Sequence, residues 1–199
     1  MAVLIPATHA PAKCGPKGRG GLWLAALILL CSLGTESFAQ TAADREYQIK
    51  AAFVFNFAQF VDWPAAAFTD RKAPLVIGIL GEDPFKTYLS DIVRGETAKS
   101  HPIVIERYRR VEEIRTCHVL CISQSEYGRL EEILASLQGR NILTVGDAEG
   151  FARRGGMIRF VTDNNKVRFR INLDAARAAS LTISSKLLRP AEIVARGRD

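Results

Sequence analysis

Short apolar runs alternate with amphipathic segments along the chain from about residue 45, and this alternation predicts a layered α/β fold. Helical periodicity predicts helices over residues 83–93 and 126–137. Strands whose residues are apolar throughout are buried on both faces of a sheet. We therefore expect a single layered domain with a mixed, mostly parallel sheet and helices on both faces. The predicted strands before the last quarter of the chain are residues 75–80, 103–107, 117–123 and 141–145.

The segment 45–63 predicts a helix that Pro64 ends, because apolar residues recur in it at helical spacing. Phe53, Phe55 and Phe57 also fit the alternation of a strand, but the length of the segment favours a helix. A helix that is apolar on nearly every side lies in a core or in an interface. The candidate residues of this packing or dimer surface are Phe53, Phe57, Phe60, Trp63 and Leu187.

Residues 157–162 and 166–172 predict a β-hairpin in the C-terminal half, with Asn164 and Asn165 in its turn. In that register the apolar residues share one face, and Arg159 lies opposite Arg170 on the other, with Arg168 beside them. Because opposed like charges destabilise a sheet, the three guanidinium groups are either splayed into solvent or matched by an anion. Arg159, Arg168 and Arg170 are therefore candidate residues for binding a partner or an anion. A last helix is expected from residue 173 to about residue 188.

The N-terminus has the pattern of an export signal. Basic residues precede the apolar segment 22–33, and Ser37 and Ala39 supply the small residues of a cleavage site before Gln40. The apolar segment is shorter than the roughly 20 residues that span a bilayer, although an uncleaved N-terminal anchor is the alternative. We expect residues 1–39 to be a cleaved signal peptide, residues 40–190 a single domain without membrane insertion, and residues 191–199 a flexible tail.

The chain carries a formal net charge of +6 and stays basic after the signal is removed. In an exported protein this charge favours an acidic protein surface, an anionic ligand or lipid head groups as partner, rather than a nucleic acid. The sequence lacks the common motifs of enzyme active sites: it has no nucleophile elbow, phosphate-binding loop or dinucleotide fingerprint. His101 and His118 lack the spacing of metal ligands. We therefore predict a binding protein with no catalytic residues, metal or cofactor.

Two cysteines remain after the signal, Cys117 and Cys121, within one predicted strand. Four residues along a strand separate Cα atoms by roughly 13 Å, whereas a disulfide tolerates about 7 Å. An internal disulfide is therefore not expected. The pair is interpreted either as two buried thiols or as the source of an intermolecular disulfide or redox-sensitive thiol, for which Cys117 is the better candidate.

Several short motifs follow one another in a fixed order between Tyr47 and Leu188. They are AAFVFNF at 51–57, VDWP at 61–64, GEDPF at 81–85, CHVL at 117–120, GGMI at 155–158, VRFRIN at 167–172 and ISSKLL at 183–188. In this order they resemble the YfiR family of exported bacterial proteins, long described as a domain of unknown function.

The resemblance implies a periplasmic, dimeric α/β protein that represses an inner-membrane diguanylate cyclase by binding its periplasmic sensor domain. It also implies that an OmpA-like outer-membrane lipoprotein can relieve the repression by sequestering the repressor. The chain departs from the family at Cys117, which matches the motif but lacks a cysteine partner, and at Arg170, where many relatives have Glu. The alternative function is a periplasmic small-molecule receptor that signals to a sensor kinase or transporter, with a pocket at the carboxyl ends of the strands.

Overall fold

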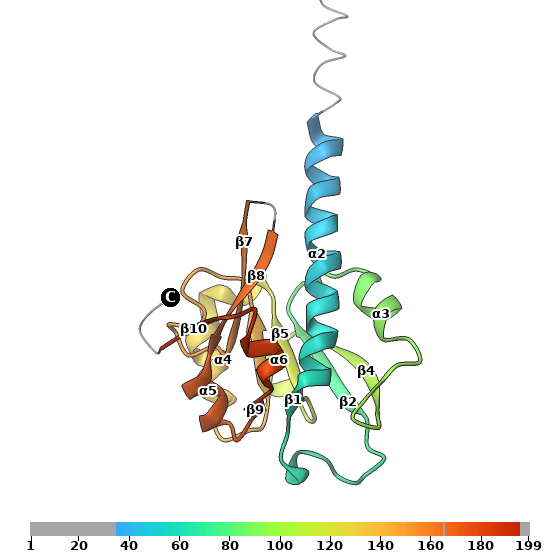
Figure 1. Cartoon of the computed structure of the whole chain (residues 1–199), viewed down its shortest axis with the longest axis vertical. Helices are drawn as coiled ribbons and strands as arrows, with labels where there is room; N and C mark the ends of the chain where they lie inside the picture. Colours follow the sequence, from blue (N-terminus) through green and yellow to red (C-terminus); the bar gives the residue numbers. More distant parts are fainter. Residues whose placement is uncertain (1–34, 165, 196–199) are drawn as a thin grey trace, which may run out of the picture. The chain divides into compact units, whose positions relative to one another are not determined.

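A computed structural model of the chain describes residues 35–164 and 166–195 (Figure 1). The chain divides into two units between Ala42 and Ala43, and every described strand lies in the second unit. An export signal was predicted for residues 1–39. Residues 1–34 of it lie outside the described residues, and residues 35–39 are helical. Among the described helices, none has the length and apolarity needed to cross a membrane.

Eight of the described strands form one sheet, in the order β10-β8-β7-β6-β5-β2-β4-β3, and β1 (Val61–Asp62) and β9 (Thr182–Ile183) form a separate two-stranded sheet. The pairs β7–β8 and β3–β4 are antiparallel and the others are parallel, so the sheet is mixed and mostly parallel, as predicted. The strands are β2 (Leu75–Leu80), β3 (Thr97–Ala98), β4 (His101–Tyr108), β5 (Val119–Ile122), β6 (Leu143–Gly146), β7 (Ile158–Asp163), β8 (Lys166–Asn172) and β10 (Glu192–Val194).

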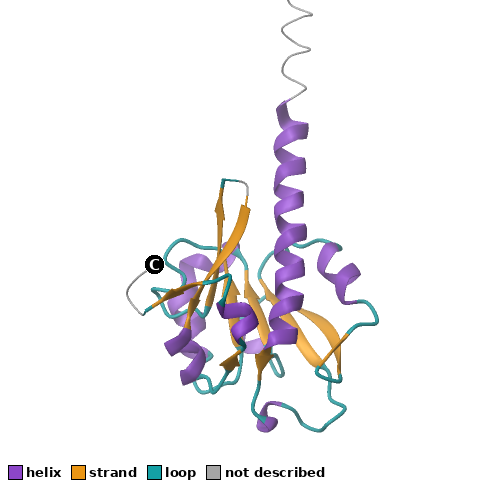
Figure 2. Ribbon diagram, viewed as in Figure 1, coloured by secondary structure: helices purple, strands orange, loops and turns teal. Residues whose placement is uncertain are grey.

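Helices cover both faces of the central strands, as the continuous apolar runs predicted (Figure 2). Alternate residues of β2 and β5 point to opposite faces, so Ile77 joins one apolar cluster and Leu120 joins the other. The first cluster contains residues of α2 (Thr35–Phe60), α3 (Tyr88–Val93), α5 (Leu173–Ala178) and α6 (Ser185–Leu188). The second contains residues of α4 (Leu130–Ser136), which follows the 3-10 helix η3 (Gln124–Arg129).

The prediction of one helix from residue 173 to about residue 188 is wrong. The chain forms α5, a short strand β9 (Thr182–Ile183) and α6 over this range. Ser180 has a φ of 58°, a left-handed conformation that a right-handed helix cannot contain. β9 pairs antiparallel with β1 (Val61–Asp62), which lies in the range assigned to the end of the first helix. Tertiary pairing between two distant segments therefore ends both predicted helices early.

Two further boundaries differ from the prediction. The helix expected from residue 83 begins at Tyr88, because Asp83 Oδ1 accepts from the backbone N–H of Phe85 in a turn (2.8 Å) and Lys86 has a φ of 53°. Within the flexible tail expected over residues 191–199, Glu192–Val194 instead forms β10 beside β8, with Val194 buried. Residues 196–199 of that tail lie outside the described residues.

Candidate functional site

The hairpin β7–β8 has the predicted register. Arg159 lies opposite Arg170, and Arg168 lies opposite Val161 two positions along the same face. Asn164 has a φ of 48°, a conformation that asparagine tolerates well in a two-residue turn. The structure therefore brings the three predicted arginines together on one face of the hairpin.

The two faces of the hairpin have different surroundings. Phe160 and Phe169 are buried on one face, where their ring centroids lie 5.7 and 5.3 Å from that of Phe57 on α2. On the opposite side of the sheet, the apolar cluster under α4 contains no described residue of β7 or β8. The hairpin thus extends the sheet beyond the cover of α4, and this explains why its residues alternate while those of β2 and β5 are apolar throughout.

The arginine face, defined by Arg159, Arg168 and Arg170, is partly matched within the chain. Arg170 Nε donates to Glu192 Oε2 at 2.9 Å, and Glu192 is also the backbone neighbour of Arg170 in the β8–β10 pairing. Arg159 and Arg170 are half-buried, whereas Arg168 is exposed. Arg168 is therefore the member of this face that is most accessible to a partner or an anion.

The predicted packing surface lies mostly within the domain. Phe57 and Leu187 are buried in the cluster beneath α2 and α6, and Phe53, Phe60 and Trp63 are half-buried and pack against it. Trp63 Nε1 also donates to the backbone carbonyl of His118 at 3.2 Å. These contacts account for packing within one chain, and a dimer interface at these residues stays a prediction.

A charged cluster at Lys50 was not predicted. Lys50 is only 3 % exposed, and its Nζ lies 2.6 Å from Asp147 Oδ2 and 2.7 Å from Glu46 Oε1. The hydroxyls of Tyr47 and Tyr127 donate to the same Asp147 carboxylate at 3.1 and 2.5 Å. Lys50 is the last charge before the largely apolar residues 51–61, which was a visible signal, but its partner 97 residues away could not be identified from the sequence.

The surroundings of Asp147 favour its ionised carboxylate. Burial pushes the pKa of Asp147 upward, but hydrogen bonds from Lys50 and Tyr127 outweigh it, so that the pKa lies below its ordinary value. Burial raises the pKa of Tyr47 and of Tyr127, and the Asp147 carboxylate raises both further, so both phenols remain protonated donors. The cluster therefore fastens α2 to the loop that follows β6.

The position of this cluster is the topological switch point of the sheet. The chain passes from β2 to β4 on one side and then crosses back to β5 on the other, and ligands of α/β proteins bind at the carboxyl ends of such strands. Here Lys50, Phe85 and Asp147 line a cavity of only about 20 Å³. That volume holds about one water molecule. The pocket expected there for a small-molecule receptor is therefore filled by the protein's own side chains.

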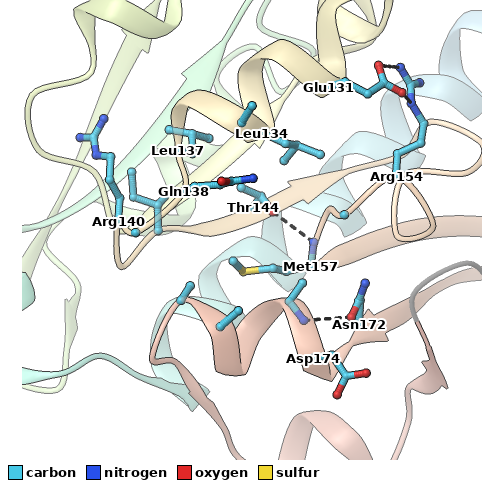
Figure 3. Close-up of a pocket in the computed structure, with 17 residues that line it drawn as sticks. Glu131, Leu134, Leu137, Gln138, Arg140, Thr144, Arg154, Met157, Asn172 and Asp174 are labelled. Carbon is cyan, nitrogen blue, oxygen red and sulfur yellow. Dashed lines mark hydrogen bonds and ion pairs between the residues drawn. The ribbon is translucent and has the colours of Figure 1, made fainter.

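A larger cavity, of about 570 Å³, lies between α4 and α5 (Figure 3). Leu134, Leu137 and Met157 supply apolar parts of its lining, and Thr144 Oγ1 accepts from the backbone N–H of Met157 at 3.1 Å. Glu131 and Arg154 form an ion pair at its rim. None of the residues predicted from the sequence as binding residues lines this cavity.

The two thiols are buried and form no disulfide with each other. Burial raises the pKa of Cys117 to about 12, so its thiol is protonated at neutral pH, and its Sγ donates to the carbonyl of Val119 at 3.2 Å. Burial also raises the pKa of Cys121. A redox role for Cys117 stays a prediction, and it requires an opening that exposes the thiol.

Comparison with known proteins finds a family match over most of the chain. A family model described as YfiR/HmsC-like matches residues 47–192, which is more than half of the chain and reaches from α2 to the first residue of β10. A search of curated proteins finds no match. The family match covers the hairpin and the cluster at Lys50.

Proposed function

Because the chain belongs to the YfiR/HmsC-like family, whose members are periplasmic regulators of cyclic-di-GMP signalling, we propose that it represses an inner-membrane diguanylate cyclase by binding the periplasmic sensor domain of that enzyme. In this proposal residues 1–39 are removed on export and the mature chain acts as a homodimer. An OmpA-like outer-membrane lipoprotein relieves repression by sequestering it. The chain acts by binding and carries out no reaction.

The arginine face is the observation that carries the proposal at the level of residues. It joins three guanidinium groups on the side of the hairpin that the cluster under α4 does not reach. Arginine binds carboxylates through two parallel hydrogen bonds, and complementary charge gives a protein interface its specificity and its rate of association. An acidic surface on the sensor domain is therefore the partner chemistry that fits this face.

Cellular cyclic-di-GMP tests the proposal. Deletion of the gene should raise the cyclic-di-GMP level, and the wild-type chain should restore it. Arg168→Glu should fail to restore it, because this exposed side chain would then repel an acidic partner. Arg71→Glu, which reverses another exposed charge, in the loop before β2, is the matched control and should restore the level. An unchanged level on deletion, in cells that express the protein, would overturn the proposal.

The second candidate function is a small-molecule receptor that signals to a sensor kinase or transporter. The cavity between α4 and α5 favours it, because about 570 Å³ lies within the range of small-molecule sites. A ligand present at 100 times its dissociation constant should stabilise the purified protein by about 2.7 kcal/mol. Ala178→Trp, which fills the cavity from α5, should abolish that stabilisation. A screen of small periplasmic solutes without any such shift would remove this candidate.

A further inference from the structure

One edge of β8 is only partly paired. β7 pairs with β8 from Lys166 to Ile171, whereas β10 pairs with it only from Arg170 to Asn172. No described strand pairs with the second edge of residues 166–169. A cavity of about 570 Å³ lies between the hairpin and the start of β10, and it is lined by residues 161–163 of β7, residues 168–170 of β8 and residues 190–192. The described residues therefore leave the edge beside the first half of β8 without a paired strand.

The backbone groups on this edge follow from the hydrogen bonding of the hairpin. The N–H of Asn172 donates to the carbonyl of Met157 at 2.8 Å. In an antiparallel pair, residues bonded to the partner strand alternate with residues whose backbone groups point away from it. Arg168 and Arg170 therefore bond to β7, while Val167 directs its N–H and C=O, and Phe169 its N–H, to the open edge; the C=O of Phe169 faces Glu192 of β10.

The side chains beside this edge differ between the two faces. Lys166 and Arg168 are exposed on the arginine face, and Val167 and Phe169 lie on the apolar face. Two acids lie nearby among the described residues: Asp163 is opposite Lys166, and Glu192 holds Arg170. An added strand would therefore meet positive charge chiefly at Arg168 on one face and apolar contacts on the other.

We propose that the edge of β8 from Lys166 to Phe169 receives an extended segment of the partner protein, in which acidic and apolar residues alternate, as an additional strand. The acidic residues lie beside Arg168 and the apolar residues continue the face of Val167 and Phe169. Backbone hydrogen bonds supply affinity and the alternating side chains supply specificity in this mode of recognition. The inference rests on the proposed function and names the kind of segment through which the partner binds.

The competing interpretation is that Lys166 and Arg168 protect the edge. Charged side chains on an edge strand discourage pairing with other chains and so prevent aggregation. In that case the same residues would repel any added strand, including an acidic one. The two interpretations differ in whether Val167 and Phe169 form new backbone hydrogen bonds.

A short fluorescent peptide of alternating Glu and Val residues is the probe, titrated into the mature protein and followed by anisotropy. It should bind, and a peptide of alternating Lys and Val should not. Val167→Pro removes an N–H that β7 does not use, and proline is tolerated at such edge positions. It should weaken binding about tenfold, the effect of losing one to two backbone hydrogen bonds. Val167→Thr keeps the N–H and is the matched control.

Hydrogen exchange gives a readout that does not depend on how a variant folds. In the wild-type protein the peptide should slow exchange at the amides of Val167 and Phe169 and leave Arg168 and Arg170 unchanged. Absence of binding, or binding without protection of those two amides, overturns the inference. If the amides are protected but deletion of the gene leaves cyclic-di-GMP unchanged, the proposed function fails and the edge site stands. If Val167→Pro represses normally and Arg168→Glu does not, the edge site fails alone.

Discussion

Replacing Lys50 with methionine should destabilise the domain by about 3 kcal/mol. The substitution keeps the length and most of the volume of the side chain but removes the ammonium group. Lys50 is 3 % exposed, and its Nζ lies within 2.7 Å of carboxylate oxygens of both Glu46 and Asp147. The substitution would therefore remove the ion pairs of both carboxylates.

The magnitude follows from what remains around Asp147. Removing one partner of a buried ion pair costs about 3–5 kcal/mol when the other charge is left uncompensated. Asp147 would still accept hydrogen bonds from Tyr47 and Tyr127, and its side chain is 23 % exposed. Glu46 is more exposed still and can turn to water. The lower end of the range is therefore expected, and for a domain of this size it lowers the melting temperature by roughly 6–12 °C.

Urea unfolding of the purified mature protein, followed by circular dichroism, measures the change in free energy. Lys72→Met removes an exposed ammonium in the loop before β2 and should change stability by less than about 0.5 kcal/mol. Combining Lys50→Met with Asp147→Asn should cost less than the sum of the two single substitutions, because they remove one shared interaction. A loss below about 1 kcal/mol for Lys50→Met, or strict additivity in the double variant, would refute the reasoning that the cluster fastens α2.

Three further predictions concern other parts of the core. Phe57→Ala should cost about 3–5 kcal/mol in urea unfolding, because Phe57 is fully buried. Burial lowers the pKa of His118, whose Nδ1 accepts from the N–H of Val76 at 3.0 Å. The unfolded chain therefore takes up the proton first, so stability should fall as pH drops below about 6.5, and His118→Gln should remove that part of the pH dependence. Cys117, with its thiol pKa raised to about 12, should react with a disulfide reagent at pH 8 only as fast as the domain opens; reaction at the rate of free cysteine would contradict its burial.

The hairpin shows what the sequence determines well. Its register follows from local information, because a shift of β8 by one residue would have placed Arg170 beside Phe160 on the core face and Phe169 on the other face. The central strands were predicted for a similar reason, since their apolar runs fit only a sheet that is covered on both sides. Both features depend on the periodicity of side chains along a single segment.

The features that the sequence did not determine depend on pairing between distant segments. Residues 173–188 have helical periodicity, but β9 gains backbone hydrogen bonds from β1, more than a hundred residues away, and Ser180 turns the chain toward it. Residues 192–194 form the strand β10 because they pair with Arg170–Asn172 of β8. Propensity is a weak preference that such tertiary contacts override.

Glu46 connects the cluster at Lys50 with the hairpin. Its Oε1 accepts from the hydroxyl of Thr162 on β7 at 2.9 Å and lies 2.7 Å from Lys50 Nζ, which in turn meets Asp147. A substitution at Lys50 can therefore disturb the hairpin without touching the arginine face. Loss of repression in Lys50→Met would for this reason say little about partner recognition, because weakened folding and a displaced hairpin would give the same result. Arg168→Glu has no such ambiguity if its melting temperature is that of the wild type, since the side chain is exposed and lies on the face away from α2.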